Sequence, residues 1–155
     1  MILKVNSNSP DRTFEIGEKI GQLLRGDEVI FLCGDLGAGK TLFTKGIASS
    51  LGINPDNVVS PSFVIMNQFK GDLHSLSHFD LYRLGENLEN NIPEIDEHIN
   101  ENIIVVEWAQ YLNPSYFRLK NSIDIKFRVR DNYIRIIKIK TSLDYITFDF
   151  IQEIP

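Results

Sequence analysis

The chain contains two short runs of consecutive apolar residues. They lie at residues 29–33 (VIFLC) and 103–106 (IIVV). A strand that is buried on both faces of a parallel sheet has this continuous apolar character, whereas a half-exposed strand alternates apolar with polar residues. We therefore predict that the two runs form central strands of a parallel sheet.

Helical spacing of apolar residues is found on both sides of the first run. Before it, apolar residues recur at roughly helical spacing up to about Arg25, and Ser9 with Pro10, or Thr13, is a candidate helix start. After it, residues 40–51 have a helical pattern that Gly52 would cap. The alternation of strands and helices predicts an α/β fold.

Several other segments are predicted to be strands. Residues 2–5 predict a short edge strand and residues 63–69 an extended segment, while residues 76–81, 123–129 and 133–140 alternate as half-buried strands do. The last two are separated by Asp131 and Asn132 and predict a hairpin. Residues 85–102 are polar and acidic and predict a helix with loops. Residues 143–155 are ambiguous, but they contain an alternation typical of a strand.

The sequence GDLGAGKT follows the first apolar run and fits the phosphate-binding pattern G-x-x-x-x-G-K-[ST]. A triphosphate needs many donors that converge on a small volume, and glycines let backbone N–H groups turn inward and let phosphate approach closely. The helix that follows points its positive N-terminal end at the same place. The expected nucleotide-binding positions are Gly34, Asp35, Leu36, Gly37, Ala38, Gly39, Lys40, Thr41 and Leu42.

Lys40 and Thr41 have the side chains that this chemistry requires. The ammonium group of Lys40 would reach the β- and γ-phosphates of ATP, and the hydroxyl of Thr41 would bind Mg²⁺. Neither side chain is expected to belong to the core. The alternative is a glycine-rich turn between strand and helix that binds nothing.

A P-loop site also needs an acid near the magnesium, usually at the end of an adjacent strand. Glu107 follows the apolar run IIVV, and Asp80 lies in the segment HFDLY. Either carboxylate would contact the metal or its waters, and the other would orient the attacking water. The alternative for each is an acid at the exposed end of a strand.

Ser60 and Ser62 lie about 20 residues after Thr41, where many P-loop proteins have a nucleotide-sensing loop. Their hydroxyls would bind the γ-phosphate or a metal-bound water, or the Ser-Pro sequence forms a plain turn. Trp108 either stacks on adenine or packs beside the strand that precedes it.

Composition narrows the class of protein. The chain has 155 residues, 43% of them hydrophobic and 24% charged, which favours one domain over residues 1–155, with a strand-rich C-terminal extension from about residue 113. The net charge of -5 argues against unaided binding of RNA, although a local basic patch is compatible with it. The chain has one cysteine and no segment typical of a signal peptide or membrane span, so we expect a cytoplasmic protein.

Four segments together resemble the TsaE (YjeE) family, the ATPases of bacterial tRNA threonylcarbamoyladenosine biosynthesis. They are GDLGAGKTLFTKGIASSLG at residues 34–52, VVSPSFVIMNQF at 58–69, HFDLYRL at 78–84 and IIVVEWAQYL at 103–112. Their order and spacing are those of the family. The Walker A motif alone is generic, but its combination with SPSF, HFDLYRL and EW is highly specific.

The resemblance implies a compact P-loop fold with a mixed β-sheet flanked by helices. It also implies slow hydrolysis of ATP with magnesium, dependent on two partner proteins, TsaB and TsaD. TsaD transfers the threonylcarbamoyl group to the adenosine beside the anticodon, and a TsaE protein is thought to drive or reset that complex. The chain is then expected to meet tRNA only through the complex and to be a monomer when isolated.

The resemblance also implies roles for individual residues. The positions carried over are Lys40, Asp80 and Glu107 for catalysis, Thr41, Asp80 and Glu107 for magnesium, and Ser60, Ser62 and Trp108 for the nucleotide. The family usually has Thr where Leu42 and Ser62 stand. Ser62 keeps a hydroxyl, whereas Leu42 loses any family contact made through one.

Three other functions share a P-loop. A small-molecule kinase usually has an arginine-bearing lid, but residues 84–117 contain no Lys or Arg. A GTP-driven switch would have an N-K-x-D-like run, which the sequence lacks. A third possibility is a protein in which ATP only stabilises a docking surface, and the two acids Asp80 and Glu107 favour hydrolysis over it.

Overall fold

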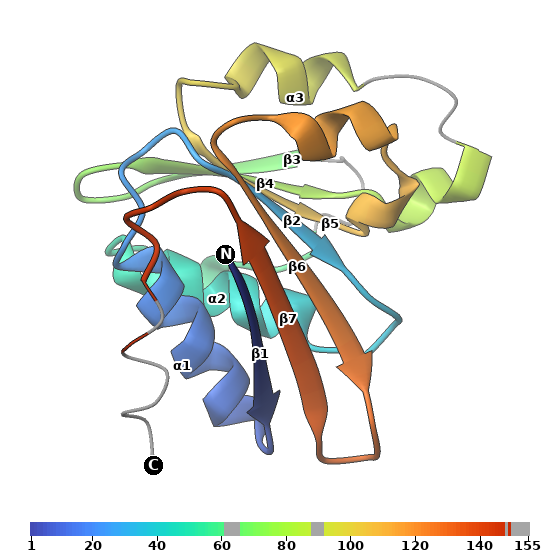
Figure 1. Cartoon of the computed structure of the whole chain (residues 1–155). Helices are drawn as coiled ribbons and strands as arrows, with labels where there is room; N and C mark the ends of the chain where they lie inside the picture. Colours follow the sequence, from blue (N-terminus) through green and yellow to red (C-terminus); the bar gives the residue numbers. More distant parts are fainter. Residues whose placement is uncertain (61–65, 88–91, 148, 150–155) are drawn as a thin grey trace.

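The computed structural model describes residues 1–60, 66–87, 92–147 and 149. Within these residues, seven strands form one sheet in the order β1-β7-β6-β2-β5-β4-β3 (Figure 1). The strands are β1 (Ile2–Ser7), β2 (Val29–Cys33), β3 (Met66–Lys70), β4 (Ser75–Asp80), β5 (Ile103–Glu107), β6 (Ser122–Val129) and β7 (Arg135–Thr141). The pairs β2–β5, β2–β6 and β4–β5 are parallel, and β1–β7, β6–β7 and β3–β4 are antiparallel. The sheet is therefore mixed, as expected.

Helices cover both faces of the central strands (Figure 1). The α-helices are α1 (Pro10–Gly21), α2 (Lys40–Ser50) and α3 (Pro93–His98), and the 3-10 turns are η1 (Pro55–Asn57), η2 (Tyr82–Asn87), η3 (Ala109–Tyr111) and η4 (Pro114–Arg118). α1 and α2 pack on one face, while α3, η3 and η4 pack on the other. Because β2 and β5 are covered from both sides, each of their residues is buried. None of the helices in the described ranges has the length and apolar character needed to cross a membrane.

Most elements predicted from the sequence are confirmed, including both apolar central strands and the hairpin of β6 and β7. α1 ends at Gly21, short of Arg25. The strand predicted at residues 63–69 is described from Met66 onward, and its first three residues lie outside the described residues. The strand-like alternation near the C-terminus is not realised at Ile146, which belongs to no strand and is buried in the core under α1 and α2.

The two long helices α1 and α2 approach closely at glycines. A Cβ atom on Gly46 of α2 would lie 2.1 Å from the carbonyl oxygen of Phe14 in α1. In the same way, a Cβ on Gly17 of α1 would lie 2.3 Å from the carbonyl oxygen of Phe43 in α2. Both distances are below van der Waals contact and involve backbone atoms, so a larger residue at either position has to push the helices apart. This contact fixes α2, and with it the loop that precedes α2, against the sheet.

Gly46→Ala tests this close contact. In an exposed helix interior the change would stabilise the fold by about 1 kcal/mol, because alanine has the higher helix propensity. Here we expect the free energy of unfolding to fall by about 1–2 kcal/mol, because overpacking outweighs propensity. Chemical denaturation measures it, with Lys45→Ala in the same helix as the control. An unchanged or increased stability of Gly46→Ala would contradict the packing.

Candidate functional site

The carboxyl ends of three parallel strands meet at one edge of the sheet. β2 leads through the loop at residues 34–39 into α2, while β4 and β5 end at Asp80 and Glu107. Asp80 and Glu107 are directly paired between β4 and β5, and Glu107 also pairs with Leu32 of β2. The register of the sheet thus brings the predicted phosphate loop and both predicted acids together.

The loop at residues 34–39 turns tightly because of its glycines. Gly37 and Gly39 have φ angles of 74° and 104°, a region that residues with a side chain rarely adopt. Gly39 is also the N-cap of α2, and no side chain caps that helix. The N–H groups of the first turn of α2 are therefore left for another acceptor, which is the arrangement that binds phosphate in P-loop proteins.

Lys40 is held inside the loop that precedes it. Its Nζ donates hydrogen bonds to the carbonyl oxygens of Gly34, at 2.7 Å, and Asp35, at 2.8 Å, and lies 4.0 Å from the centre of the Trp108 ring. Lys40 is only 5% exposed, so it is buried within the loop, although it belongs to neither of the two apolar clusters that form the core. Burial lowers the pKa of Lys40, and the charges of Glu107 and Asp80 oppose that shift.

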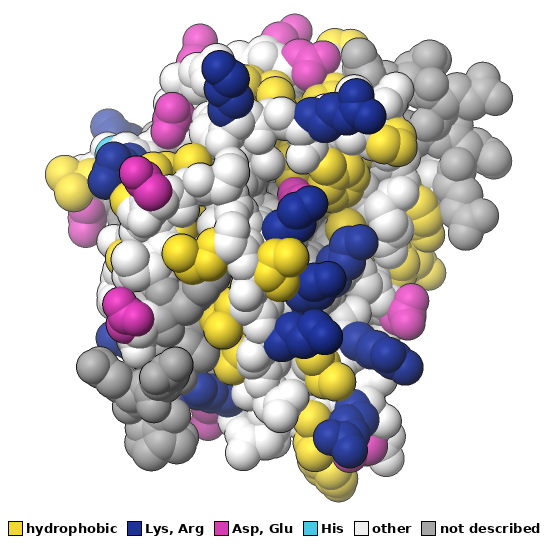
Figure 2. Space-filling view, in the orientation of Figure 1, with side chains coloured by type: hydrophobic (Ala, Val, Ile, Leu, Met, Phe, Trp, Pro, Cys, Tyr) yellow, Lys and Arg dark blue, Asp and Glu magenta, His cyan; other side chains and the backbone are white. Residues whose placement is uncertain are grey.

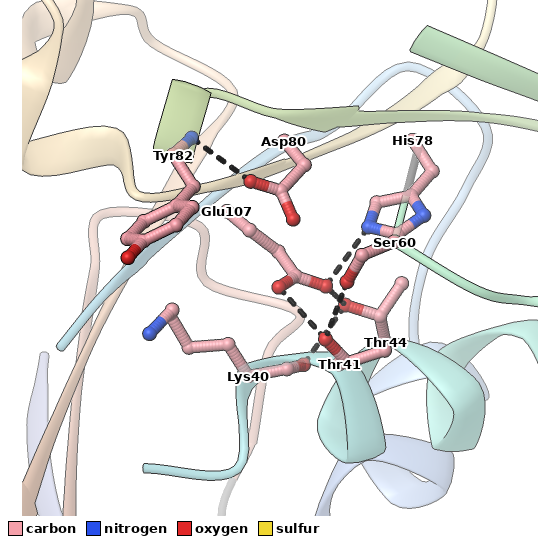
Figure 3. Close-up of polar contacts among 8 residues, drawn as sticks. All are labelled: Lys40, Thr41, Thr44, Ser60, His78, Asp80, Tyr82 and Glu107. Carbon is pink, nitrogen blue, oxygen red and sulfur yellow. Dashed lines mark hydrogen bonds and ion pairs between the residues drawn. The ribbon is translucent and has the colours of Figure 1, made fainter. Parts of the chain in front are cut away.

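Glu107 is a buried carboxylate with several hydrogen-bond donors around it (Figure 3). Its Oε2 accepts from the hydroxyl of Thr41 at 2.9 Å. Its Oε1 lies 2.9 Å from Nε2 of His78 and accepts from the hydroxyl of Thr44 at 3.3 Å. Because Glu107 is only 2% exposed, these contacts replace the water that the carboxylate loses. They also fix its orientation toward the start of α2.

Asp80 lies beside Glu107 but in a more open position (Figure 3). It is half-buried, and its Oδ1 accepts a hydrogen bond from the backbone N–H of Tyr82 at 2.9 Å. The hydroxyl of Ser60 lies 3.2 Å from that of Thr41. The two acids and two hydroxyls therefore surround one small space above the first turn of α2.

Trp108 packs within the site. It has a left-handed backbone with φ 59°, which is rare for a residue other than glycine. The centre of its ring lies 4.8 Å from that of Tyr82 and 5.7 Å from that of Tyr111, and the residue is 9% exposed. Of the two interpretations made from the sequence, the structure shows the packing contact, which covers the ammonium group of Lys40.

These residues line an open cavity of about 430 Å³, a size typical of small-molecule sites. The sequence-predicted residues in its lining are Leu36, Gly37, Ala38, Gly39, Lys40, Thr41, Leu42, Ser60, Asp80, Glu107 and Trp108. Gly34 and Asp35 do not line it, but they hold Lys40 through their carbonyl groups. Ser62 lies outside the described residues.

Some residues of the site were not assigned to it from the sequence. His78 and Thr44 hold Glu107, and the strand period of two does place His78 on the same face as Asp80. Arg135, at the start of β7, also lines the cavity, with Nη2 3.4 Å from the carbonyl oxygen of Gly37. No local motif signals Arg135, because only the return of β7 along the sheet brings it to the loop.

The donors that face the cavity are suited to a hard cation. Within the described residues, no cluster of three or more His, Cys, Asp or Glu side chains has the arrangement of a protein-only metal site. Mg²⁺ does not need one, because it is usually held by one or two carboxylates together with substrate phosphates and water. The hydroxyl of Thr41 and the carboxylates of Glu107 and Asp80 match that donor set.

Comparisons with known proteins agree with the fold and the motifs. A family model described as threonylcarbamoyl adenosine biosynthesis protein TsaE matches residues 7–137. The tRNA threonylcarbamoyladenosine biosynthesis protein TsaE of Aquifex aeolicus is 41% identical over 74% of this chain and 82% of that protein. The protein of the same name from Rickettsia felis is 30% identical over 96% of this chain and 86% of that protein.

Among solved structures, that of YdiB from Bacillus subtilis is similar, with a TM-score of 0.72 and 25% sequence identity. The match covers 93% of this chain and 88% of that one. Sequence and structure thus lead to the same assignment: the chain belongs to the TsaE family of threonylcarbamoyl adenosine biosynthesis proteins.

Proposed function

We propose that this chain binds ATP with Mg²⁺ and hydrolyses it, in support of a TsaB–TsaD complex that makes threonylcarbamoyladenosine in tRNA. The observation that carries the proposal is the hydrogen bond between the Thr41 hydroxyl and Glu107. It joins the phosphate loop to an acid at the end of the neighbouring strand. P-loop NTPases hold magnesium with this pair of groups, a loop Ser or Thr and a strand-end acid.

Lys40 supplies the positive charge for the phosphates. An ammonium group has three donors, and two of them are directed to the carbonyl oxygens of Gly34 and Asp35. The third donor is then available to a phosphate oxygen. Arg135, which lines the cavity and contacts Gly37, would supply a second cation near the phosphates. Both positive groups would act by stabilising charge in a partly dry site.

The two acids have different surroundings and therefore different proposed roles. Glu107 is buried and directed at Thr41, so it would hold Mg²⁺ or one of its waters together with that hydroxyl. Asp80 is more open, and its position beside Glu107 would allow it to orient the attacking water. Bound magnesium would neutralise the negative charge that develops on the β- and γ-phosphates.

The phosphate loop is tested by Lys40→Met and Thr41→Val, which keep most of the packing volume but remove the ammonium group and the hydroxyl. We expect each to lower ATP turnover by about 100-fold or more, because stabilisation of transition-state charge is lost. Lys45→Met, later in α2, is the matched control. Turnover is measured by phosphate release, and circular dichroism checks folding. Wild-type turnover in a folded Lys40→Met protein would refute the site.

The division of roles between the acids is tested by Glu107→Gln and Asp80→Asn, with the exposed Asp56→Asn as the control. Both site variants should lose about 100-fold in kcat. Glu107→Gln should in addition require more Mg²⁺ for half-maximal activity, whereas Asp80→Asn should bind ATP and Mg²⁺ as the wild type does. If both variants hydrolyse ATP normally, the acids are wrongly assigned.

The role of partners is tested by reconstitution with TsaB, TsaD and tRNA. The isolated chain should hydrolyse ATP slowly and bind tRNA weakly. Addition of TsaB–TsaD should change its turnover, because a partner that prefers one nucleotide state shifts the populations of the cycle. Because Ser60 contacts Thr41, we expect Ser60→Ala to uncouple the two activities, so that ATP hydrolysis no longer supports repeated tRNA modification. Ser115→Ala is the control. Many rounds of modification without this chain would contradict the proposal.

A further inference from the structure

Three neighbouring strands, β6, β7 and β1, present lysines on one face of the sheet. Their alternate residues point into the core under α1 and α2, for example Ile125 and Ile139. The residues between them point to the opposite face, where four lysines are exposed: Lys4, Lys126, Lys138 and Lys140, which we call the lysine face. Figure 2 shows Lys and Arg side chains gathered over β6 and β7.

The strand register places these lysines next to one another. Lys138 of β7 is paired directly with Lys126 of β6 on one side and with Lys4 of β1 on the other. Adjacent strands are about 4.8 Å apart, and like charges at directly opposite positions destabilise a sheet. A row of three lysines is therefore an arrangement that the fold alone does not favour.

Little negative charge balances this row. The ion pairs within the described residues are Arg12–Glu15 and His78–Glu107, so none of the four lysines has an ionic partner within 4.0 Å there. One acid, Asp124, is paired opposite Lys140. Four lysines against one acid give this face a local excess of positive charge, although the whole chain has a net charge of -5.

The lysine face adjoins the candidate nucleotide site. A cavity of about 650 Å³ is lined by Lys126, Lys138 and Lys140, and it extends to Gly34 and Gln110. Gly34 is the first residue of the phosphate loop, and its carbonyl oxygen accepts a hydrogen bond from Lys40. The side chain of Gln110 both donates to the carbonyl oxygen and accepts from the N–H group of Gly34. A ligand on the lysine face would therefore lie beside the phosphate loop.

We propose that the lysine face binds the phosphate backbone of RNA, with tRNA as the RNA that the family assignment places in this process. Lysine is depleted in the cores of protein–protein interfaces, whereas neutralisation of phosphates by lysine dominates binding to nucleic acids. The row across three strands matches a repeating anion better than a single small one. The proposal adds an RNA-binding surface to the proposed ATPase, and it does not depend on ATP hydrolysis. It replaces the expectation that the chain meets tRNA only through other proteins.

Few phosphate contacts are available on this face. With three to four lysines, binding by the isolated chain is weak and strongly dependent on salt, because each neutralised phosphate contributes about 0.7–0.9 to the slope of log K against log salt. The rest of the affinity would come from the partner proteins. The net charge of -5 conceals this surface, because that number sums the charges of the whole chain.

The test compares two triple variants of the full chain that remove the same charge. One carries Lys4→Gln, Lys126→Gln and Lys138→Gln; the control carries Lys19→Gln, Lys45→Gln and Lys70→Gln. Binding of an unmodified tRNA transcript is followed by fluorescence anisotropy from about 20 to about 150 mM salt. We expect the lysine-face variant to lower the salt slope by about 2–3, and the control to leave it within about 0.5 of the wild type.

Three results would overturn the proposal: no measurable binding of tRNA by the wild type at about 20 mM salt, equal losses in both triple variants, or a lysine-face variant that binds tRNA normally but no longer binds TsaB–TsaD. The last would assign the face to a protein partner. Thermal denaturation checks that the variants are folded. The lysine-face variant should melt at or above the wild-type temperature because like charges have been removed. ATP turnover, measured separately, keeps this test distinct from that of the proposed function.

Discussion

The site depends on one buried carboxylate that is held between a strand and a helix. Glu107 ends β5 and accepts a hydrogen bond from Thr41 in the first turn of α2. A buried carboxylate without donors would cost several kcal/mol or would be protonated, so its position is stable only while hydroxyl and imidazole groups surround it. Thr41, Thr44 and His78 provide them. The same hydrogen bonds therefore determine both the geometry of the phosphate loop and the position of the acid.

That contact requires the rest of the fold. The parallel pairing of β2 with β5 places the end of β5 beside the loop that leaves β2, and the pairing of β4 with β5 adds Asp80. The close approach of α1 and α2 at Gly17 and Gly46 then holds α2 against this edge. A change of register by one residue would turn Glu107 to the other face of the sheet, and the site would be lost.

Those parts of the site that depend on local sequence patterns could be predicted from the sequence. The phosphate loop has a fixed spacing, and apolar runs identified β2 and β5 and hence the acid that ends β5. The partners of Glu107 were harder to predict, because His78 alone resembles a structural histidine and Thr44 is one of several hydroxyls in α2. Arg135 and the lysine face depend on the order of strands across the sheet, which single-strand patterns do not contain. Lys40 is buried because Trp108 packs over it, a contact between residues far apart in the chain.

The central claim is that Thr41 and Glu107 form one end of a magnesium–nucleotide site. A crystal of the chain grown with a non-hydrolysable ATP analogue and Mn²⁺, which replaces Mg²⁺, tests it most directly through anomalous scattering. The account predicts a metal peak in contact with the Thr41 hydroxyl, with Glu107 bound to the metal or to one of its waters, and the triphosphate in the loop at residues 34–41. A nucleotide bound elsewhere, or a metal remote from Thr41 and Glu107, would contradict it.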